Sequence, residues 1–359
     1  MIPITRPFFP PLEQVHAALA EVWESGWLTN HGPKVQELER RLAERLDAHV
    51  VVVANGTLAL QLGIRAAGLR GRVITTPFSF VATTSALVWE QCEPVFADVD
   101  PDTLNLSASA LAAIDAEGVS GVLATHVYGN CCDVDAIGRL ARERGWPVLY
   151  DAAHAFGASW RGRPAMAWGD AATASFHATK VFHTAEGGAV VTRNGDLAER
   201  VRRLRSFGER EKGDFEDVGI NAKMSEVHAA LGLAMWPHVD VILAERRRQA
   251  ERYRARLAGR VGFVSAPEGC VPNHAYMPIL LASETALLRV EAALLAAGIQ
   301  GRRYFHPSLS TLPWVRRTPT PVADDAARRV LCLPLFHGLP DRDLDRICDV
   351  VLRTSGGVA

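Results

Sequence analysis

Residues 175–188 read SFHATKVFHTAEGG and centre on a single lysine, Lys180. The lysine stands between a short β-prone run, 174–177, and a glycine pair that opens a second run, 189–192. Because large apolar residues flank it, we expect its amine to be partly desolvated, which disfavours the ammonium form. A neutral lysine amine is a nucleophile for carbonyl groups. The stretch therefore indicates a reactive lysine, and the alternative is an ordinary surface residue.

On both sides of this stretch, apolar β-branched runs alternate with segments of helical character. The expected strands are 50–53, 72–76, 94–98, 121–126, 147–150 and 189–192, and the expected helices are 58–67, 80–90, 108–116, 134–144 and 196–207. Such alternation predicts an α/β fold built from βαβ units around a mostly parallel sheet. Ligands bind such sheets at the carboxyl ends of the strands, so the residues that follow the strands are the first candidates for a site.

A change of pattern after Pro237 predicts a second domain. A long amphipathic helix, 239–257, leads to expected strands at 262–265 and 275–281 and helices at 284–297, 323–330 and 341–352. Two amphipathic helices, 11–27 and 33–46, precede the first strand. We therefore expect a large domain over residues 1–237 and a smaller α+β domain over residues 238–359.

Composition excludes several classes of function. The chain has 359 residues, a net charge of -1 and 48% hydrophobic residues, which is typical of a globular protein and argues against nucleic acid as the main partner. Its six cysteines lack metal-ligand spacing, which indicates reduced thiols, a cytoplasmic location and no metal site. No signal peptide is visible, and no apolar run looks long enough to span a membrane.

Two of the residue groups that follow strands stand out. Gly56 and Thr57 open a helix, where unpaired N–H groups and the helix dipole attract an anion such as a phosphate, although simple capping by Asn55 or Thr57 is the alternative. Asp151 follows a buried strand, and a carboxylate there needs a partner. The small residues beside it leave room for a flat group. The alternative for Asp151 is a cap of the next helix.

These groups meet the requirements of pyridoxal 5′-phosphate, which needs a lysine, a carboxylate at its pyridine nitrogen, an anion seat and a flat wall. Lys180 would form the Schiff base and later serve as the base that moves the proton. Asp151 would keep the pyridine nitrogen protonated. The other expected contacts are Gly56, Thr57 and Ser175 with the phosphate, Phe80 with one ring face and His154 with the other.

Seven short motifs, in this order and spacing, resemble the DegT/DnrJ/EryC1/StrS family of sugar aminotransferases within the fold type I pyridoxal-phosphate enzymes. They are NGTLAL (55–60), SFVAT (79–83), PVFADVD (94–100), YDAAHA (150–155), SFHATK (175–180), EGG (186–188) and GIN (219–221). The resemblance runs almost from end to end. It implies the same cofactor roles for the residues named above, and it implies that Asn221 reaches the cofactor phosphate of a neighbouring subunit. A homodimer with shared sites is therefore expected.

The family pattern also bears on the reaction. A dehydratase branch of the family carries histidine in place of the lysine, so Lys180 favours amino transfer. Several members have glutamine where this chain has His154, and many have arginine where it has Lys223, whose role stays open.

The substrate is expected from the same resemblance. The chain looks most like members that aminate C4 of the nucleotide sugar dTDP-4-keto-6-deoxyglucose with L-glutamate as donor. A 3-keto sugar, an aminocyclitol ketone and a non-enzymatic, cofactor-binding regulatory role are the alternatives. Thr29, Tyr304 and His306 are candidate sugar contacts, although Thr29 could belong to a capped turn and the other two could pack the seam between the domains.

Overall fold

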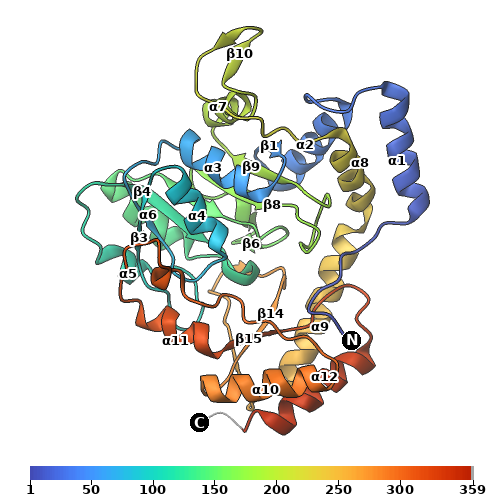
Figure 1. The fold of residues 1–359 in the computed structure, drawn as a ribbon, viewed down its shortest axis with the longest axis vertical. Coiled ribbons are helices and arrows are strands. Elements are labelled where there is room, and N and C mark those ends of the chain that lie inside the picture. Colours follow the sequence, from blue (N-terminus) through green and yellow to red (C-terminus); the bar gives the residue numbers. More distant parts are fainter. Residues whose placement is uncertain (357–359) are drawn as a thin grey trace.

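The computed structural model describes residues 1–356, and a seven-stranded sheet lies at its centre (Figure 1). The strand order is β1-β9-β8-β5-β4-β2-β3. The strands are β1 (His49–Val53), β2 (Arg72–Thr75), β3 (Glu93–Phe96), β4 (Val119–Thr125), β5 (Val148–Asp151), β8 (Ala171–Ser175) and β9 (Gly188–Thr192). From β3 to β8 all neighbours pair in parallel, which confirms the expected α/β class.

Strand β9 is the exception, because it pairs antiparallel with both β8 and β1. A parallel connection needs a crossover element, usually a helix. The chain between β8 and β9 contains no helix, only the loop that carries Lys180. The chain therefore reverses direction in this loop, and β9 runs back beside β8.

Helices cover both faces of the sheet, and the strands are buried on both sides. They are α2 (Pro33–Leu46), α3 (Gly56–Ala66), α4 (Val81–Trp89), α5 (Ala108–Ala112), α6 (Val134–Arg144) and α7 (Gly195–Arg205). Val50 and Val52 of β1 belong to a core with α2 and α6, whereas Val51 and Val53 belong to a core with α3, α4 and α7. This division follows from the alternation of side chains along a strand.

The C-terminal part of the chain builds a core of its own. Its elements are α9 (Val239–Leu257), β12 (Gly262–Phe263), β14 (Met277–Leu280), α10 (Glu284–Ala296), β15 (Val330–Leu333) and α12 (Asp341–Thr354). The buried alanines of α11 (Pro321–Arg329) belong instead to a cluster with Phe78 and Tyr128 of the sheet domain. The N-terminus joins this body, since Ile2 bridges to Ile299 and the N–H of Leu335 donates to the carbonyl of Ile4 at 3.2 Å. The expected boundary at residue 237 stays a prediction, but the first residues lie with the C-terminal core.

Several short elements were not expected from the sequence. They are β6 (Ser159–Trp160), β7 (Arg163–Pro164), β10 (Glu209–Glu211), β11 (Asp214–Phe215), β13 (Cys270–Val271) and the 3₁₀ turns η1 (Val127–Gly129), η2 (Ala165–Ala167), η3 (Trp236–His238) and η4 (Leu309–Thr311). Strands of two or three residues carry no alternation that a sequence could reveal. Val330 begins β15, whereas we expected it to end a helix.

One stretch differs from the expectation about membranes. Glu226–Leu257, in which α8 (Glu226–Met235), η3 and α9 follow one another, contains a window of mean hydropathy 1.4 that is long and apolar enough to cross a membrane by length and composition. Of that window, 39% is buried inside the protein. Core helices of soluble proteins share these properties. Here α8 contacts α2 and α1 (Leu12–Ser25), which accounts for its apolar character.

Candidate active site

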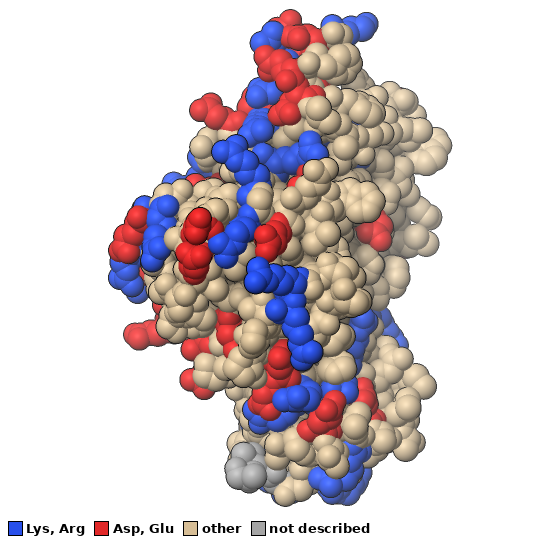
Figure 2. All heavy atoms as spheres, turned by 60° about the vertical axis from the view of Figure 1, so that its left-hand side comes forward, with Lys and Arg blue, Asp and Glu red and all other residues tan. Residues whose placement is uncertain are grey.

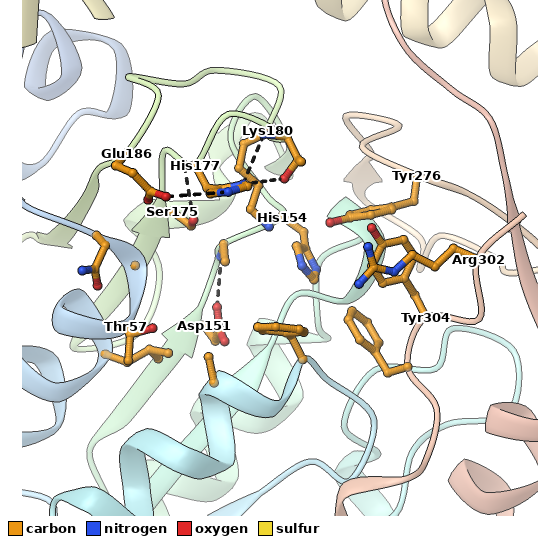
Figure 3. A pocket seen from close by; sticks show the side chains of 18 residues that line it. Thr57, Asp151, His154, Ser175, His177, Lys180, Glu186, Tyr276, Arg302 and Tyr304 are labelled. Atoms are coloured by element: carbon orange, nitrogen blue, oxygen red, sulfur yellow. Dashed lines mark hydrogen bonds and ion pairs between the residues drawn. The ribbon is translucent and has the colours of Figure 1, made fainter. Parts of the chain in front are cut away.

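A cavity of about 300 Å³ lies at the carboxyl edge of the central sheet, where β5, β8 and the N-termini of α3 and α4 meet (Figure 3). Eight of the residues expected from the sequence line it: Gly56, Thr57, Phe80, Asp151, His154, Ser175, Lys180 and Tyr304. Three others, Thr29, Asn221 and His306, do not line this cavity. The fold thus brings into one cavity residues that are more than a hundred positions apart in the sequence.

Lys180 is held by a closely bonded loop. Within that loop the N–H of Lys180 donates to the carbonyl of His177 at 2.8 Å, and the N–H of Ala178 donates to the carbonyl of Ala185 at 2.7 Å. Burial lowers the pKa of Lys180 to about 8, and the nearby carboxylate of Asp151 opposes this shift. A substantial fraction of the amine is therefore neutral near physiological pH, as a nucleophile requires.

Asp151 ends β5, and only 4% of it is exposed. Its Oδ2 accepts a hydrogen bond from Oγ1 of Thr83 at 2.6 Å, and its Oδ1 accepts one from the N–H of Ala153 at 3.1 Å. Burial raises the pKa of the carboxyl, while Thr83, Ala153 and Lys180 act in the opposite direction. Within residues 1–356 no ion pair reaches this carboxylate. A buried carboxylate of this kind is stabilised by a cation in the cavity.

The first turn of α3 forms a seat for an anion. The side chain of Asn55 caps the helix, because its Oδ1 accepts from the N–H of Leu58 at 2.9 Å. The N–H groups of Gly56 and Thr57 have no hydrogen-bond partner within residues 1–356. Gly56 also lies against β8, since a Cβ built on it would approach the Cβ of Ser175 to 2.8 Å. Capping and anion binding, which the sequence left as alternatives, are therefore compatible.

Aromatic side chains form the walls of the cavity. Phe80, just before α4, is 50% exposed and borders the open space. The ring of His154 stacks on Phe305 with a centroid distance of 5.5 Å and an interplanar angle of 9°, and Tyr276 contacts its edge at 4.9 Å. Burial lowers the pKa of His154 well below its usual range, so the ring is neutral. Its Nδ1 is buried and has no hydrogen-bond partner.

These observations fit the cofactor expected from the sequence. The donor set offers a lysine of lowered pKa, a buried carboxylate without a cation, free helix N–H groups beside Ser175, and an unpaired histidine nitrogen. Pyridoxal 5′-phosphate supplies an aldehyde, a pyridine nitrogen, a phosphate and a flat ring. Each of these groups has a matching partner in the cavity.

The three residues outside the cavity are all exposed. Asn221 follows the β10–β11 hairpin and bridges to Ser206. Thr29 lies in the turn between α1 and α2, where its carbonyl accepts from the indole of Trp27, as the capped-turn alternative describes. Within one chain, therefore, neither residue adjoins Lys180.

Some lining residues were not assigned a role from the sequence. They are Tyr276, Arg302, His177, Thr179, Glu186 and Phe305. Arg302 and Phe305 lie close in sequence to the expected contact Tyr304, and His177 and Thr179 lie inside the lysine motif. Tyr276 carries no local signal, because it reaches the cavity from the C-terminal body.

Comparisons with known proteins agree with this geometry. Residues 12–352 match the DegT/DnrJ/EryC1/StrS aminotransferase family. The chain is 37% identical to a dTDP-4-amino-4,6-dideoxy-D-glucose transaminase of Shigella dysenteriae, with 97% of each chain covered. It is 33% identical to a protein of the same name from Escherichia coli, with 98% of each covered.

Among solved structures, DesI crystallised in the presence of its TDP-sugar product is similar to this chain. The TM-score is 0.94 and the identity 37%, and the match covers 99% of this chain and 93% of DesI. The similarity confirms the expected fold, with its large sheet domain and smaller C-terminal part.

Proposed function

The chain belongs to the DegT/DnrJ/EryC1/StrS aminotransferase family, and from this premise we propose that it transfers the amino group of L-glutamate to C4 of dTDP-4-keto-6-deoxyglucose, with pyridoxal 5′-phosphate as cofactor. Relatives at 37% and 33% identity, both named dTDP-4-amino-4,6-dideoxy-D-glucose transaminases, support this substrate. The observation that carries the proposal is the convergence of Lys180, Asp151 and the α3 N-terminus in one cavity.

The cofactor, when bound, supplies an aldehyde that combines with amines and a ring that withdraws electrons from the carbon beside the amino nitrogen. Asp151 would keep the pyridine nitrogen protonated, which would maintain that withdrawal. The N–H groups of Gly56 and Thr57, with the hydroxyl of Ser175, hold the phosphate. Phe80 and His154 orient the ring.

Lys180 moves the proton. Its Nζ removes the proton from the α-carbon of glutamate in the first half of the reaction and delivers a proton to C4 of the sugar in the second. In the cofactor-free protein burial lowers the pKa of Lys180 to about 8, so protonated and neutral forms of its amine coexist near neutral pH. Tyr304 lies in the same cavity and is a candidate contact for the sugar, together with the exposed Thr29 and His306.

We also propose a homodimer in which Asn221 of one chain contributes to the cavity of the other. The β10–β11 hairpin, just before Asn221, stands out from the body of the protein (Figure 1). Phe207, Phe215 and Val218 around it are more than half exposed, an arrangement that a second copy would cover. Asn221 is exposed and outside its own cavity, as a residue shared with a partner must be.

Surface charge and cysteine chemistry support the remaining expectations. On the face shown in Figure 2, basic side chains are interspersed with acidic ones, which does not favour nucleic acid as a partner. All six cysteines are free, and a cytoplasmic location suits free thiols.

A mass-resolved assay tests the proposal. The purified protein, loaded with cofactor, is incubated with L-glutamate and a panel of dTDP- and GDP-linked 4-keto and 3-keto sugars. A 4-amino product from dTDP-4-keto-6-deoxyglucose is the expected result. A product only from the 3-keto isomer would move the reaction to C3. No product from any sugar, with a normal cofactor spectrum, would favour a cyclitol acceptor or a regulatory role.

A further inference from the structure

Arg302, an exposed residue, presents a cation to the active-site cavity. Its N–H donates to the carbonyl of Cys332 at 3.1 Å, and the N–H of Cys332 donates back to the carbonyl of Arg302 at 2.9 Å. The backbone of Arg302 is thereby fastened to β15. Its guanidinium carbon lies 4.5 Å from the ring centroid of Tyr304, and the side chain lines the cavity together with Tyr276. An arginine stacked on an aromatic ring keeps its orientation.

This guanidinium has no acidic partner. Within residues 1–356 no ion pair involves Arg302, whereas its neighbour Arg303 pairs with Glu284 at 2.6 Å. Among the described residues that line the cavity, Arg302 is also the only arginine. A planar guanidinium with free donors matches the geometry of a carboxylate or a phosphate group. The position therefore suits an anionic group of a ligand.

The anion seat for the cofactor lies elsewhere in the cavity. Figure 3 shows Thr57 and Ser175 on one side of the cavity and Arg302 on the other, beside Tyr276 and Tyr304, with His154 between them. A phosphate at the N-terminus of α3 would leave Arg302 free. An anion bound at Arg302 would therefore belong to a substrate.

We propose that Arg302 binds the carboxylate on the reacting carbon of the amino donor. This inference rests on the proposed function, in which glutamate is the donor. The amino group of glutamate must reach the same reactive position as Lys180, and its α-carboxylate is attached to the same carbon, so that carboxylate must also lie inside the cavity. The diphosphate of a nucleotide sugar is attached across the sugar ring from C4. It is therefore farther from the reacting centre.

Glutamate and the keto sugar react in different half-reactions, so the effect of a substitution on each substrate can be measured separately. In the first, L-glutamate converts the aldehyde form of the cofactor to the amine form, and the change in absorbance is measured in a single turnover. In the second, the amine form reacts with the keto sugar. The variants are Arg302→Gln and Arg302→Lys, with Arg303→Gln as the matched control because Arg303 is paired outside the cavity. Thermal unfolding verifies that each variant is folded.

We expect Arg302→Gln to raise the glutamate concentration for half-maximal rate by about 10- to 100-fold, the range for a lost hydrogen bond to a charged group. Arg302→Lys should recover part of that loss. The sugar half-reaction of both variants should lose less than the glutamate half-reaction, because Arg302 would meet the sugar only through its stacking on Tyr304. Binding of 2-oxoglutarate, measured by calorimetry, should weaken in parallel without requiring turnover. Arg303→Gln should change none of these quantities.

Three results would overturn these statements in distinguishable ways. Wild-type kinetics with glutamate in Arg302→Gln would refute the inference alone. A loss confined to the sugar half-reaction would assign Arg302 to the nucleotide sugar, directly or through Tyr304, which also refutes it. A wild-type protein whose cofactor spectrum does not respond to glutamate would refute the proposed donor and, with it, the role of Arg302.

Discussion

The hydroxyl of Thr83 donates a 2.6 Å hydrogen bond to Oδ2 of Asp151, and both residues are buried. A hydroxyl has one proton, and Thr83 gives its proton to the carboxylate. The hydroxyl of Thr83 therefore accepts the 2.7 Å hydrogen bond from Ser79, and the hydroxyl of Ser79 accepts one from Thr125 at 3.1 Å. Three hydroxyl groups therefore point their protons toward Asp151. Such a chain stabilises the ionised carboxylate.

Replacing Thr83 with valine should raise the pKa of Asp151, because the bond favours the charged form. Asp151 acts as a carboxylate, so the acid limb of the pH–activity profile should move to higher pH, and cofactor affinity should fall by about tenfold, the range for one hydrogen bond to a charged group. The measurements are kcat as a function of pH and a cofactor titration.

Thr84→Val is the matched control for that experiment. Thr84 is equally buried, but its Oγ1 has no hydrogen-bond partner, so the substitution removes only an unsatisfied polar atom. Its pH profile should be that of the wild type and its stability equal or higher. An equal shift in both variants would mean that Thr83 acts through packing alone.

The sequence could predict the parts of this site that depend on local chemistry. Asp151 stands at the end of a continuous apolar run, Gly56 opens a helix, and Lys180 has aromatic neighbours, so each could be found without a structure. The resemblance then supplied their common purpose.

Other features depend on tertiary placement and could not be predicted in this way. Tyr276 reaches the cavity only because the C-terminal body lies beside the sheet, and Ile2 joins that body through a pairing with Ile299. Thr83 looks like any helical threonine until β5 places a carboxylate beside it. The antiparallel course of β9 follows from the absence of a helix in the lysine loop.

Lys180 should react with the cofactor in a pH-dependent way. Since its pKa is about 8 in the cofactor-free protein, the rate of covalent capture should rise up to about pH 8 and then level off. Trapping with borohydride at each pH measures this rate. Asp151→Asn should move the midpoint to lower pH, because the carboxylate raises the pKa of Lys180. An unchanged midpoint would show that the two groups do not interact. Lys180→Ala should trap no cofactor.

The same pKa affects stability. The unfolded chain keeps a lysine pKa near 10.4, so between about pH 8 and pH 10 the unfolded state binds more protons at this residue than the folded state. Stability contributed by this residue therefore rises with pH across that window. Lys180→Met should lack this pH-dependent gain in stability. Urea unfolding of both proteins from pH 7 to pH 10 measures the gain as the difference between their midpoints.

Gly56→Ala should weaken cofactor binding more than it weakens the fold. The new methyl group would stand 2.8 Å from the Cβ and 3.1 Å from the Oγ of Ser175, so the turn must move away from β8. That movement misplaces the N–H groups of the anion seat, and we expect the dissociation constant for the cofactor to rise by about tenfold or more, as for a lost hydrogen bond to a charged group.

Gly138→Ala provides the contrast to Gly56→Ala. Gly138 lies inside α6, where the new methyl group meets only the end of the Arg142 side chain at 3.4 Å. Helix propensity predicts a gain in stability of up to about 1 kcal/mol and unchanged cofactor affinity. If Gly56→Ala also bound cofactor like the wild type, the phosphate seat would have to lie elsewhere.

The shared-site homodimer can be tested by complementation. Lys180→Ala removes the reactive amine from one chain, and Asn221→Ala removes the residue expected to reach the neighbouring cavity. A mixed dimer of the two variants contains one site with both substitutions and one site with neither. We therefore expect each variant alone to have little activity and the refolded mixture to recover about one quarter of the wild-type value, because half of the dimers are mixed and each has one intact site.

The complementation result can be interpreted only if the two variants exchange subunits. Tagging each variant differently and isolating the doubly tagged dimer gives a population in which half of the sites are intact. Activity near half of the wild-type value in that fraction would support an Asn221 that serves its partner. No activity in the isolated mixed dimer would mean that Asn221 and Lys180 act within the same chain, which their separation in the structure argues against, since Asn221 is exposed and does not line the cavity that holds Lys180.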